Sequence, residues 1–302
     1  MRINKKLNLT LLLRFGNYEK LKAQFDNNQI EFSCIANWID YCKKIGDLIT
    51  GDDFEGAFAH EYKIFNFKSL RDARDEPMDE NLFINELKDG SYLLSYKPII
   101  LTPIVCFFGI SLKNDLSEDL TNLFNNNGEI RILLDEYMRT FCYDPSRTGM
   151  LLIREPLSFI YELKQQIPNN LKSSKNLSSA MFYSTFNETN PIDAGFVDYN
   201  KYDKKRHFFD NKVIGQEIFW KNKDYEWQNE FRIAINNIHY VEKNAPGNEL
   251  YNANKNKLLI TLHNLNKYCD FFSMKMIDQL RLQKDKQDNE KCVFGLHIKK
   301  PN

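Results

Sequence analysis

The chain has 302 residues, and its 41 lysine and arginine residues balance 41 aspartate and glutamate residues, so the formal net charge is zero. This balance excludes the overall basic excess that is typical of proteins bound along duplex DNA, and it leaves room only for a local basic patch. A hydrophobic content of 42%, with 14% aromatic residues, excludes a disordered chain and favours a packed globular protein.

The cysteines, the histidines and the N-terminus exclude further classes. The six cysteines and five histidines are dispersed, without a CxxC pair, so we expect no metal site and reduced, buried thiols. The first apolar run, Leu11–Leu13, is too short for a signal peptide, and no run of about 18 apolar residues occurs. We therefore expect a soluble, cytoplasmic protein that makes no membrane contact.

Short apolar segments bounded by turn residues predict the strands, and apolar residues three or four positions apart predict the helices. The predicted strands are Leu7–Phe15, Gln29–Cys34, Glu61–Phe67, Tyr92–Ser95, Ile99–Gly109, Gly149–Ile153, Phe196–Tyr199, Gln228–Ile235, Leu258–Leu262 and Cys292–Ile298. The predicted helices are Tyr18–Phe25, Trp38–Lys44, Leu116–Asn127, Ile130–Cys142, Pro156–Gln166 and Tyr268–Leu282. These elements predict an α+β fold with mixed, mostly antiparallel central sheets flanked by helices. We expect one domain over residues 1–302, with a helical insertion at about 115–145.

Four polar segments refine this prediction. Asn17 is placed to cap the first helix. Thr50–Gly56, TGDDFEG, is an acidic turn whose plain interpretation is a solvated loop. Ile167–Ser179 is the best candidate for a linker, and Lys201–Arg206, KYDKKR, is a basic cluster that is either a solvated turn or a contact for phosphates.

The stretch Lys223–Asn236, KDYEWQNEFRIAIN, is the one around which we organise the functional interpretation. Its second half alternates as a strand does, with apolar residues at positions 231, 233 and 235. Gln228, Glu230 and Arg232 therefore share the opposite face. This face is either a functional wall or an ordinary solvated face of a sheet.

An arginine, a serine and a Gln-x-Glu pair follow one another along the chain, each on a different predicted strand. Arg14 ends the first predicted strand, Ser33 lies on the second, and Gln228 precedes Glu230 by two residues on a late strand. This order resembles the R-S-E class of the ADP-ribosyltransferases, over three short stretches of the chain. The resemblance implies an ADP-ribosyltransferase-like fold, NAD as substrate, and a nucleic acid or a protein as acceptor.

The chemistry of such a transfer fits these residue types. Cleavage of the nicotinamide–ribose bond passes through an oxocarbenium-like state, which a fixed carboxylate stabilises, and Glu230 would take that role. Gln228 would position the acceptor. Arg14 would hold the dinucleotide phosphates in a bidentate grip, and Ser33 would position the ribose.

Three aromatic residues are candidates for stacking on nicotinamide: Phe15, Tyr18 and Phe32. The chain has no GxGxxG fingerprint, which argues against a Rossmann oxidoreductase but not against this fold. Structural roles remain open for both arginines. Arg14 is also a possible ion-pair partner of Glu230 or Glu55, and Arg232 is either an ion-pair partner of Glu230 or a phosphate ligand.

A second resemblance is longer and looser. The segments LLLRFGNYEKL, QIEFSC, GDDFEG, PIVCFFG, GMLLIREPLSFIYEL, GFVDY and FWKNKDYEWQNEFRI together resemble an uncharacterised bacterial family found among phage-defence and mobile-element genes. The similarity extends from about Leu11 to Leu265. It implies a single domain and a toxin or antiviral defence role, with an antitoxin or another defence-system protein as partner, and it assigns no catalytic residue.

Two other functions stay open. The first is a non-catalytic binding or sensor module, in which the polar face of the late strand is a recognition surface. The second is a nuclease that holds Mg²⁺ with Asp52, Asp53, Glu55 and Glu230.

Overall fold

The computed structural model describes residues 9–39, 54–61, 82–111, 129–132, 147–173, 181–183, 190–199, 216–236, 238–240, 257–284 and 292–298. These residues fall into two compact units. The first unit holds those of Glu31–Cys106 and Lys164–Ile260, and the second holds those of Asn4–Ile30, Phe107–Leu163 and Thr261–Asn302. The single domain expected from the sequence stays a prediction.

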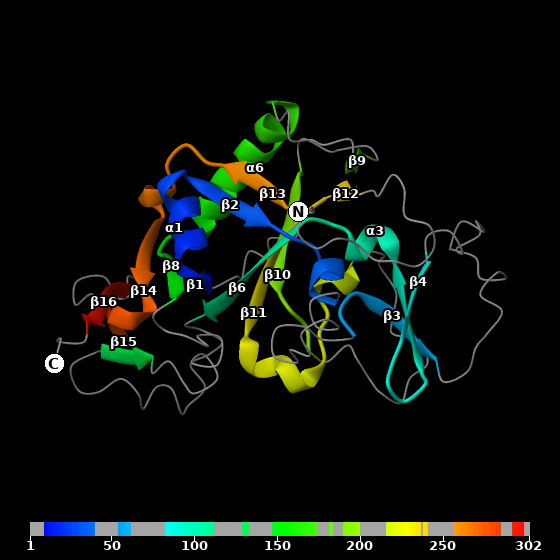
Figure 1. Ribbon diagram of the computed structural model, residues 1–302. Helices are drawn as coiled ribbons and strands as arrows, with labels where there is room; N and C mark the ends of the chain where they lie inside the picture. The colour runs from blue at the N-terminus through cyan, green and yellow to red at the C-terminus, as the bar shows by residue number, and fades with distance from the viewer. Residues whose placement is uncertain are drawn as a thin grey trace. The chain divides into compact units, whose positions relative to one another are not determined.

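A three-stranded antiparallel sheet forms part of the first unit (Figure 1). Its middle strand is β5 (Tyr92–Tyr96), which pairs with β3 (Ala57–Glu61) on one side and with β4 (Leu82–Glu86) on the other. One face of this sheet packs against Trp220, and the opposite face holds a second apolar cluster around Leu94. Both faces are therefore covered, which explains why the apolar side chains of these strands do not follow a simple alternation.

The strand β11 (Glu230–Ile235) is the other main strand of the first unit, and all six of its residues are buried. It pairs antiparallel with β10 (Ile192–Phe196) and also neighbours β6 (Ile104–Ser111). Two short 3-10 helices, η3 (Gln216–Phe219) and η4 (Lys223–Gln228), precede it in the chain (Figure 1). The alternation of apolar residues thus predicted this strand correctly.

In the second unit, β1 (Leu9–Asn17) lies between β6 and β8 (Thr148–Ile153), and β14 (Cys269–Ser273) pairs with the other edge of β8. All these pairings are antiparallel. A Cβ atom at Gly149 would come within 2.8 Å of the Phe271 ring, so only glycine permits this close approach between β8 and β14.

Two helices begin at the residues predicted from the sequence. The helix α1 (Tyr18–Asp26) is capped by Asn17, whose Oδ1 accepts a hydrogen bond from the Lys20 N–H at 3.0 Å. The helix α6 (Pro156–Ser173) begins at the predicted proline.

The remaining elements are shorter or belong to smaller sheets. They are the sheet of β2 (Gln29–Phe32) and β13 (Leu258–Thr261), the sheet of β9 (Met181–Tyr183) and β12 (Ile238–Tyr240), the sheet of β7 (Glu129–Ile132), β15 (Ile277–Lys284) and β16 (Cys292–Ile298), and the short helices α3 (Lys97–Ile100), η5 (Leu265–Lys267) and η6 (Met274–Met276).

Several predictions of helix and loop were wrong. The predicted helix Tyr268–Leu282 is instead β14, η6 and most of β15, because these segments find partner strands in β8, β7 and β16. Such pairing outweighs a weak helical stripe. The predicted linker Ile167–Ser179 is helical as far as Ser173, with Pro168 inside the helix.

Two further segments differ from expectation. In the predicted helical insertion at about 115–145, Glu129–Ile132 is the strand β7, and the other residues of the insertion lie outside the described part of the chain. The predicted strand Ile99–Gly109 begins as the helical turn α3, with Pro98 at a first-turn position, and becomes the strand β6 only at Ile104.

Taken together, the described residues form a mixed α+β structure of mostly antiparallel sheets with few helices, which confirms the predicted class. The finer prediction of an ADP-ribosyltransferase-like arrangement stays a prediction. Within the described part of the chain, no helix combines the length and the apolar character needed to cross a membrane.

Candidate functional site

A tight turn at Asn229 precedes Glu230, the first residue of β11. Gln228 is the last residue of η4, so the prediction that it lies on the strand was wrong. Asn229 joins the two in the left-handed conformation, with φ 39° and ψ 50°, which asparagine adopts more readily than most residues. Through this turn, Gln228 and Glu230 reach the same cationic side chain, that of Lys221.

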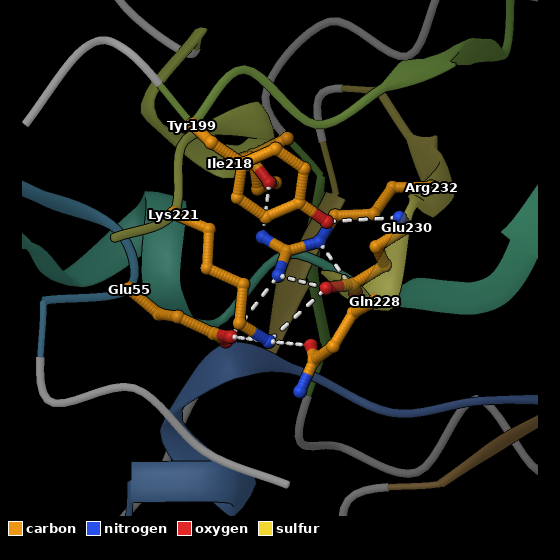
Figure 2. A network of polar contacts seen from close by, with 7 residues as sticks. All are labelled: Glu55, Tyr199, Ile218, Lys221, Gln228, Glu230 and Arg232. Atoms are coloured by element: carbon orange, nitrogen blue, oxygen red, sulfur yellow. Dashed lines mark hydrogen bonds and ion pairs between the residues drawn. The ribbon is translucent and has the colours of Figure 1, made fainter. Parts of the chain in front are cut away.

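The polar face of β11 is neither a solvated surface nor an open wall. Glu230 and Arg232 are 8% and 0% exposed, and they belong to a buried cluster with Glu55, Lys221 and Gln228 (Figure 2). We call these five residues the ion network. All five lie in the first unit.

Arg232 is the centre of the ion network. Its Nε donates to Glu230 Oε1 at 2.9 Å and its Nη2 to Glu230 Oε2 at 3.1 Å, which is a bidentate pair. Its Nη2 also contacts Glu55 Oε1 at 3.1 Å, and its Nη1 donates to the backbone oxygen of Ile218 at 2.6 Å. Of the two roles that the sequence left open for Arg232, the structure therefore shows the ion-pair partner of Glu230.

Lys221 joins the two carboxylates from the other side. Its Nζ lies 2.7 Å from Glu55 Oε1, 2.6 Å from Gln228 Oε1 and 3.1 Å from Glu230 Oε2. An ammonium group has three hydrogens to donate, so these three contacts use its full capacity. Figure 2 shows the Nζ atom at the meeting point of the three side chains.

Glu55 reaches the ion network from a tight turn that the sequence needs glycine to make. Gly56 has a φ of +70°, and a Cβ atom there would come within 2.8 Å of Ile100. Across this turn the Ala57 N–H donates to the backbone oxygen of Phe54 at 3.1 Å. Glu55 is only 1% exposed, so the interpretation of this acidic segment as a solvated loop is wrong for Glu55.

The charges of the ion network cancel, because two carboxylates face two cations. Burial disfavours the charged form of Glu230, but Arg232 and Lys221 outweigh it and hold the pKa of this carboxyl far below its usual range. Burial likewise opposes the charge of Lys221, yet Glu230 and Glu55 raise its pKa above the ordinary lysine value. Glu230 and Lys221 thus keep their charges together.

Polar and aromatic side chains surround the ion network. The Tyr199 hydroxyl accepts a hydrogen bond from the Glu230 N–H at 2.9 Å, and the Cys106 thiol donates to the Glu230 carboxylate. Burial, and then the charge of Glu230, raise the pKa of Cys106 well above its usual value, so the thiol stays protonated. Lys221 lies 5.0 Å from the Tyr225 ring centre, and Arg232 lies 5.6 Å from that of Trp38.

The predicted NAD-binding residues are divided between the two units. Ser33 belongs to the first unit, where its hydroxyl accepts from Asn37 Nδ2 at 3.0 Å, and the ring of Phe32 is completely buried. Arg14 belongs to the second unit, and its Nη1 donates to Gln24 Oε1 at 3.4 Å. The predicted stacking residues Phe15 and Tyr18 also belong to the second unit, where the ring centre of Tyr18 lies 5.2 Å from that of Phe271. Their convergence on one NAD cleft stays a prediction.

The metal-dependent nuclease finds little support in this geometry. Glu55 and Glu230 do belong to one cluster, as that hypothesis requires, but Lys221 and Arg232 bridge them and take the place between the carboxylates. Asp52 and Asp53 lie outside the described residues. Among the described residues, no group of three or more His, Cys, Asp or Glu side chains is arranged to hold a metal ion.

Sequence reasoning missed two members of the site. Lys221 lies in an irregular segment between η3 and η4, where no periodicity marks it, and only its position beside the buried Trp220 hinted at burial. Tyr199 was placed on a predicted strand without a role. By contrast, the spacing of Glu230 and Arg232, two residues apart on a strand, predicted that they share a face and made their contact one of two alternatives for Arg232.

Searches of protein-family models, of curated proteins and of solved structures find no match to this chain.

Proposed function

We propose that this chain is an ADP-ribosyltransferase-like toxin or phage-defence effector, which transfers ADP-ribose from NAD to a nucleic acid or a protein. The observation that carries the proposal is the state of Glu230. A buried carboxylate that two cations keep permanently ionised, among aromatic rings, is the group that a positively charged transition state requires. Residues whose pKa is shifted far from the ordinary value tend to cluster at active sites, and Glu230 is one such residue.

In the proposed reaction the C1′–nitrogen bond of NAD breaks, and both electrons of the bond leave with nicotinamide. The positive charge that develops on the ribosyl group lies against Glu230. The acceptor then attacks C1′, and Gln228, whose amide nitrogen points away from Lys221, positions it (Figure 2). Ser33, which belongs to the same unit as Glu230, would position the ribose.

The contacts of Lys221 suggest how a ribose hydroxyl would reach Glu230. Its contact with Glu230 Oε2, at 3.1 Å, is longer than its contacts with Glu55 at 2.7 Å and Gln228 at 2.6 Å. Lys221 would therefore stay anchored by Glu55 and Gln228 when a hydroxyl replaces it on Glu230. The side chain of Glu230 is 10% exposed and those of Lys221 and Arg232 at most 2%, so Glu230 is the least buried of these three side chains.

The test is incubation of the purified chain with labelled NAD and a cell lysate. Wild type is expected to label a macromolecule, and Glu230→Gln to abolish the labelling. The matched control is Glu226→Gln, which removes a carboxylate from an exposed position of η4 and should leave labelling intact. Circular dichroism of each variant tests its folding, and a folded Glu230→Gln protein that still labels the lysate would contradict the proposal.

One observation favours a second function, a non-catalytic binding or sensor module of a defence system. Glu230 receives four donors, from the Nε and Nη2 of Arg232, the Nζ of Lys221 and the thiol of Cys106, and a carboxylate has about four acceptor positions. A carboxylate whose acceptor positions are all occupied in this way suits a structural role, in which it holds neighbouring segments together. If the chain is such a module, wild type leaves NAD intact, and Glu230→Gln changes stability alone.

A further inference from the structure

The strand β10 lies at an edge of its sheet, directly beside β11, the strand that begins with Glu230 (Figure 1). Within the described part of the chain, β11 is the strand that pairs with β10, and no strand pairs with its other side. Such an edge presents a row of backbone N–H and C=O groups to which a further strand can bind. Positions 193–196 of β10 are only half-buried, so solvent reaches this edge.

Hydrogen bonds just beyond β10 show which of its backbone groups point outward. The Val197 N–H donates to the backbone oxygen of Glu230 in β11 at 2.8 Å. The next residue, Asp198, bonds on the opposite side, where its N–H donates to the Phe219 oxygen at 2.7 Å and its oxygen accepts from the Lys221 N–H at 3.3 Å. Successive residues of a strand alternate in this way. The even-numbered positions of β10 therefore direct their N–H and C=O groups away from β11.

The chain already adds one short segment on this outer side. Residues 219–221 form an isolated parallel bridge to Asp198, centred on Trp220. Lys221 of this segment belongs to the ion network. The outward groups of β10 continue the row that begins at Asp198. A strand added along β10 would therefore lie close to the ion network.

Gly195 leaves open space on the face of β10 that adjoins the ion network. It pairs directly with Arg232, and paired residues of antiparallel strands point to the same face. A Cβ atom at Gly195 would meet nothing within 4 Å, whereas one at Gly149 would meet the Phe271 ring at 2.8 Å. Packing within the chain thus explains Gly149 but not Gly195. A glycine inside a strand often marks a place where a ligand or another backbone approaches closely.

We infer that the acceptor is a protein, and that an extended segment of it adds as a strand to the outer edge of β10 around Ala194. The inference rests on the proposed function, because it names the acceptor of that reaction. In strand addition, main-chain hydrogen bonds provide the affinity. The partner residue that pairs with Gly195 extends its side chain over this glycine, on the face that carries Arg232 and Glu230.

A nucleic acid fits this edge less well than a peptide does. The edge alternates N–H donors with C=O acceptors, and an extended peptide offers both kinds of group in the complementary order. A phosphate backbone offers negatively charged acceptor oxygens, which leave the C=O groups of the edge without donors. Asp193 of the same strand adds a carboxyl group, which disfavours phosphate further.

The test uses a random-peptide library selected for binding to the full chain. Ala194→Pro removes an N–H that points outward and retains the hydrogen bonds to β11, because proline is tolerated on an edge strand at such a position. The selected peptides should bind to Ala194→Pro at least about tenfold more weakly than to wild type. Ala194→Ser, which keeps the N–H, is the matched control and should bind them as wild type does.

A measurement on wild type protects this test from misfolding of the proline variant. On addition of a selected peptide, the Ala194 amide should exchange its hydrogen more slowly, because it then donates to the added strand. The inference is wrong if the library yields no binding peptide, if the selected peptides bind equally to Ala194→Pro, or if the Ala194 amide stays unprotected. A dimer of the chain that Ala194→Pro dissociates would assign the edge to a second copy and also contradict it.

The outcome is distinguishable from that of the proposed function. In the experiment with labelled NAD and lysate, the label should be removed by protease and should decrease with Ala194→Pro. A label that depends on Glu230 but is removed by nuclease would support the transferase and contradict the inference. Peptide binding that depends on Ala194, with no NAD consumption by wild type, would support strand addition at β10 and contradict the transferase.

Discussion

Two ion pairs of this chain, one in each unit, have almost the same length and very different surroundings. In the first unit, Lys221 Nζ lies 2.7 Å from Glu55 Oε1, and the side chains are 2% and 1% exposed. In the second unit, Arg154 Nε lies 2.6 Å from Asp270 Oδ2, and the side chains are 34% and 42% exposed. The length of an ion pair therefore does not tell what it contributes, and the comparison must be made on burial.

Burial changes the consequence of losing one partner. An exposed pair is screened by water and salt, and it typically contributes about 0–1 kcal/mol. A buried pair adds little compared with an apolar replacement of both partners, but removing one partner leaves a buried charge without compensation and costs about 3–5 kcal/mol. The ion network should thus respond strongly to single substitutions, and the exposed pair weakly.

The largest expected effect is that of Arg232→Met. Among the described residues, this change leaves Lys221 as the one cationic partner of Glu55 and Glu230, so we expect a loss of about 3–5 kcal/mol in the free energy of unfolding. All three tryptophans of the sequence, Trp38, Trp220 and Trp227, fall in the first unit, so urea unfolding followed by tryptophan fluorescence reports on that unit.

A second substitution makes this prediction specific to charge. Adding Glu55→Gln to Arg232→Met lowers the excess negative charge, and the double variant should be less destabilised than the sum of its single variants. A loss of less than about 1 kcal/mol for Arg232→Met would show that the ion network contributes no more than an ordinary surface ion pair does. Burial would then not explain a difference between the two pairs.

The pH dependence should separate Glu230 from exposed carboxylates. Because its pKa in the folded state lies far below the value of about 4.3 in an unfolded chain, its stabilising contribution is complete above that value and is lost as the pH falls toward the folded pKa. Below about pH 4, wild type should lose up to about 1.4 kcal/mol per pH unit more than Glu230→Gln does. Equal slopes for the two proteins between pH 5 and about pH 3 would show that Glu230 titrates normally.

Local patterns in the sequence predicted the elements whose cause is local. Asn17 caps α1 as expected because the capping bond spans three residues, and β11 follows from a strict alternation over six residues. The failure at Tyr268–Leu282 has the opposite cause. Apolar residues there satisfy a helical spacing by chance. The observed strands depend on β7 and β8, which lie far away in the sequence, and on the next strand, β16.

The same distinction applies to the ion network. The shared face of Glu230 and Arg232 could be predicted from their spacing of two on one strand, and their contact was one of two alternatives that this spacing allowed. The contact of Arg232 with Glu55 joins residues 177 positions apart, and no local pattern carries that information. The burial of an acidic turn residue was therefore unpredictable, although the glycine that makes the turn possible was visible in the sequence.

A smaller effect is expected from Tyr268→Phe in the second unit. The Tyr268 hydroxyl donates to Glu162 Oε2 at 2.6 Å, and the other oxygen of this carboxylate accepts from the His263 N–H at 2.7 Å. The hydrogen bond to Glu162, followed by burial, raises the pKa of Tyr268 to about 12. Loss of one such bond should cost about 1–2 kcal/mol, measured by hydrogen exchange at amides of the second unit. Tyr161→Phe, on an exposed ring of α6, is the control and should change nothing.

The smallest effect is expected from Asp270→Asn, and it completes the comparison. The substitution removes the charge that faces Arg154 and retains nearly the same shape, so the loss should be below about 1 kcal/mol at low salt. Because the side chains of this pair are 34% and 42% exposed, the difference from wild type should shrink further in 1 M NaCl, where dissolved ions screen accessible charges. The loss caused by Arg232→Met should persist in the same salt, since counter-ions do not reach a guanidinium that is 0% exposed. Equal salt sensitivity of the two variants, by fluorescence for the first unit and hydrogen exchange for the second, would mean that the ion network opens to solvent.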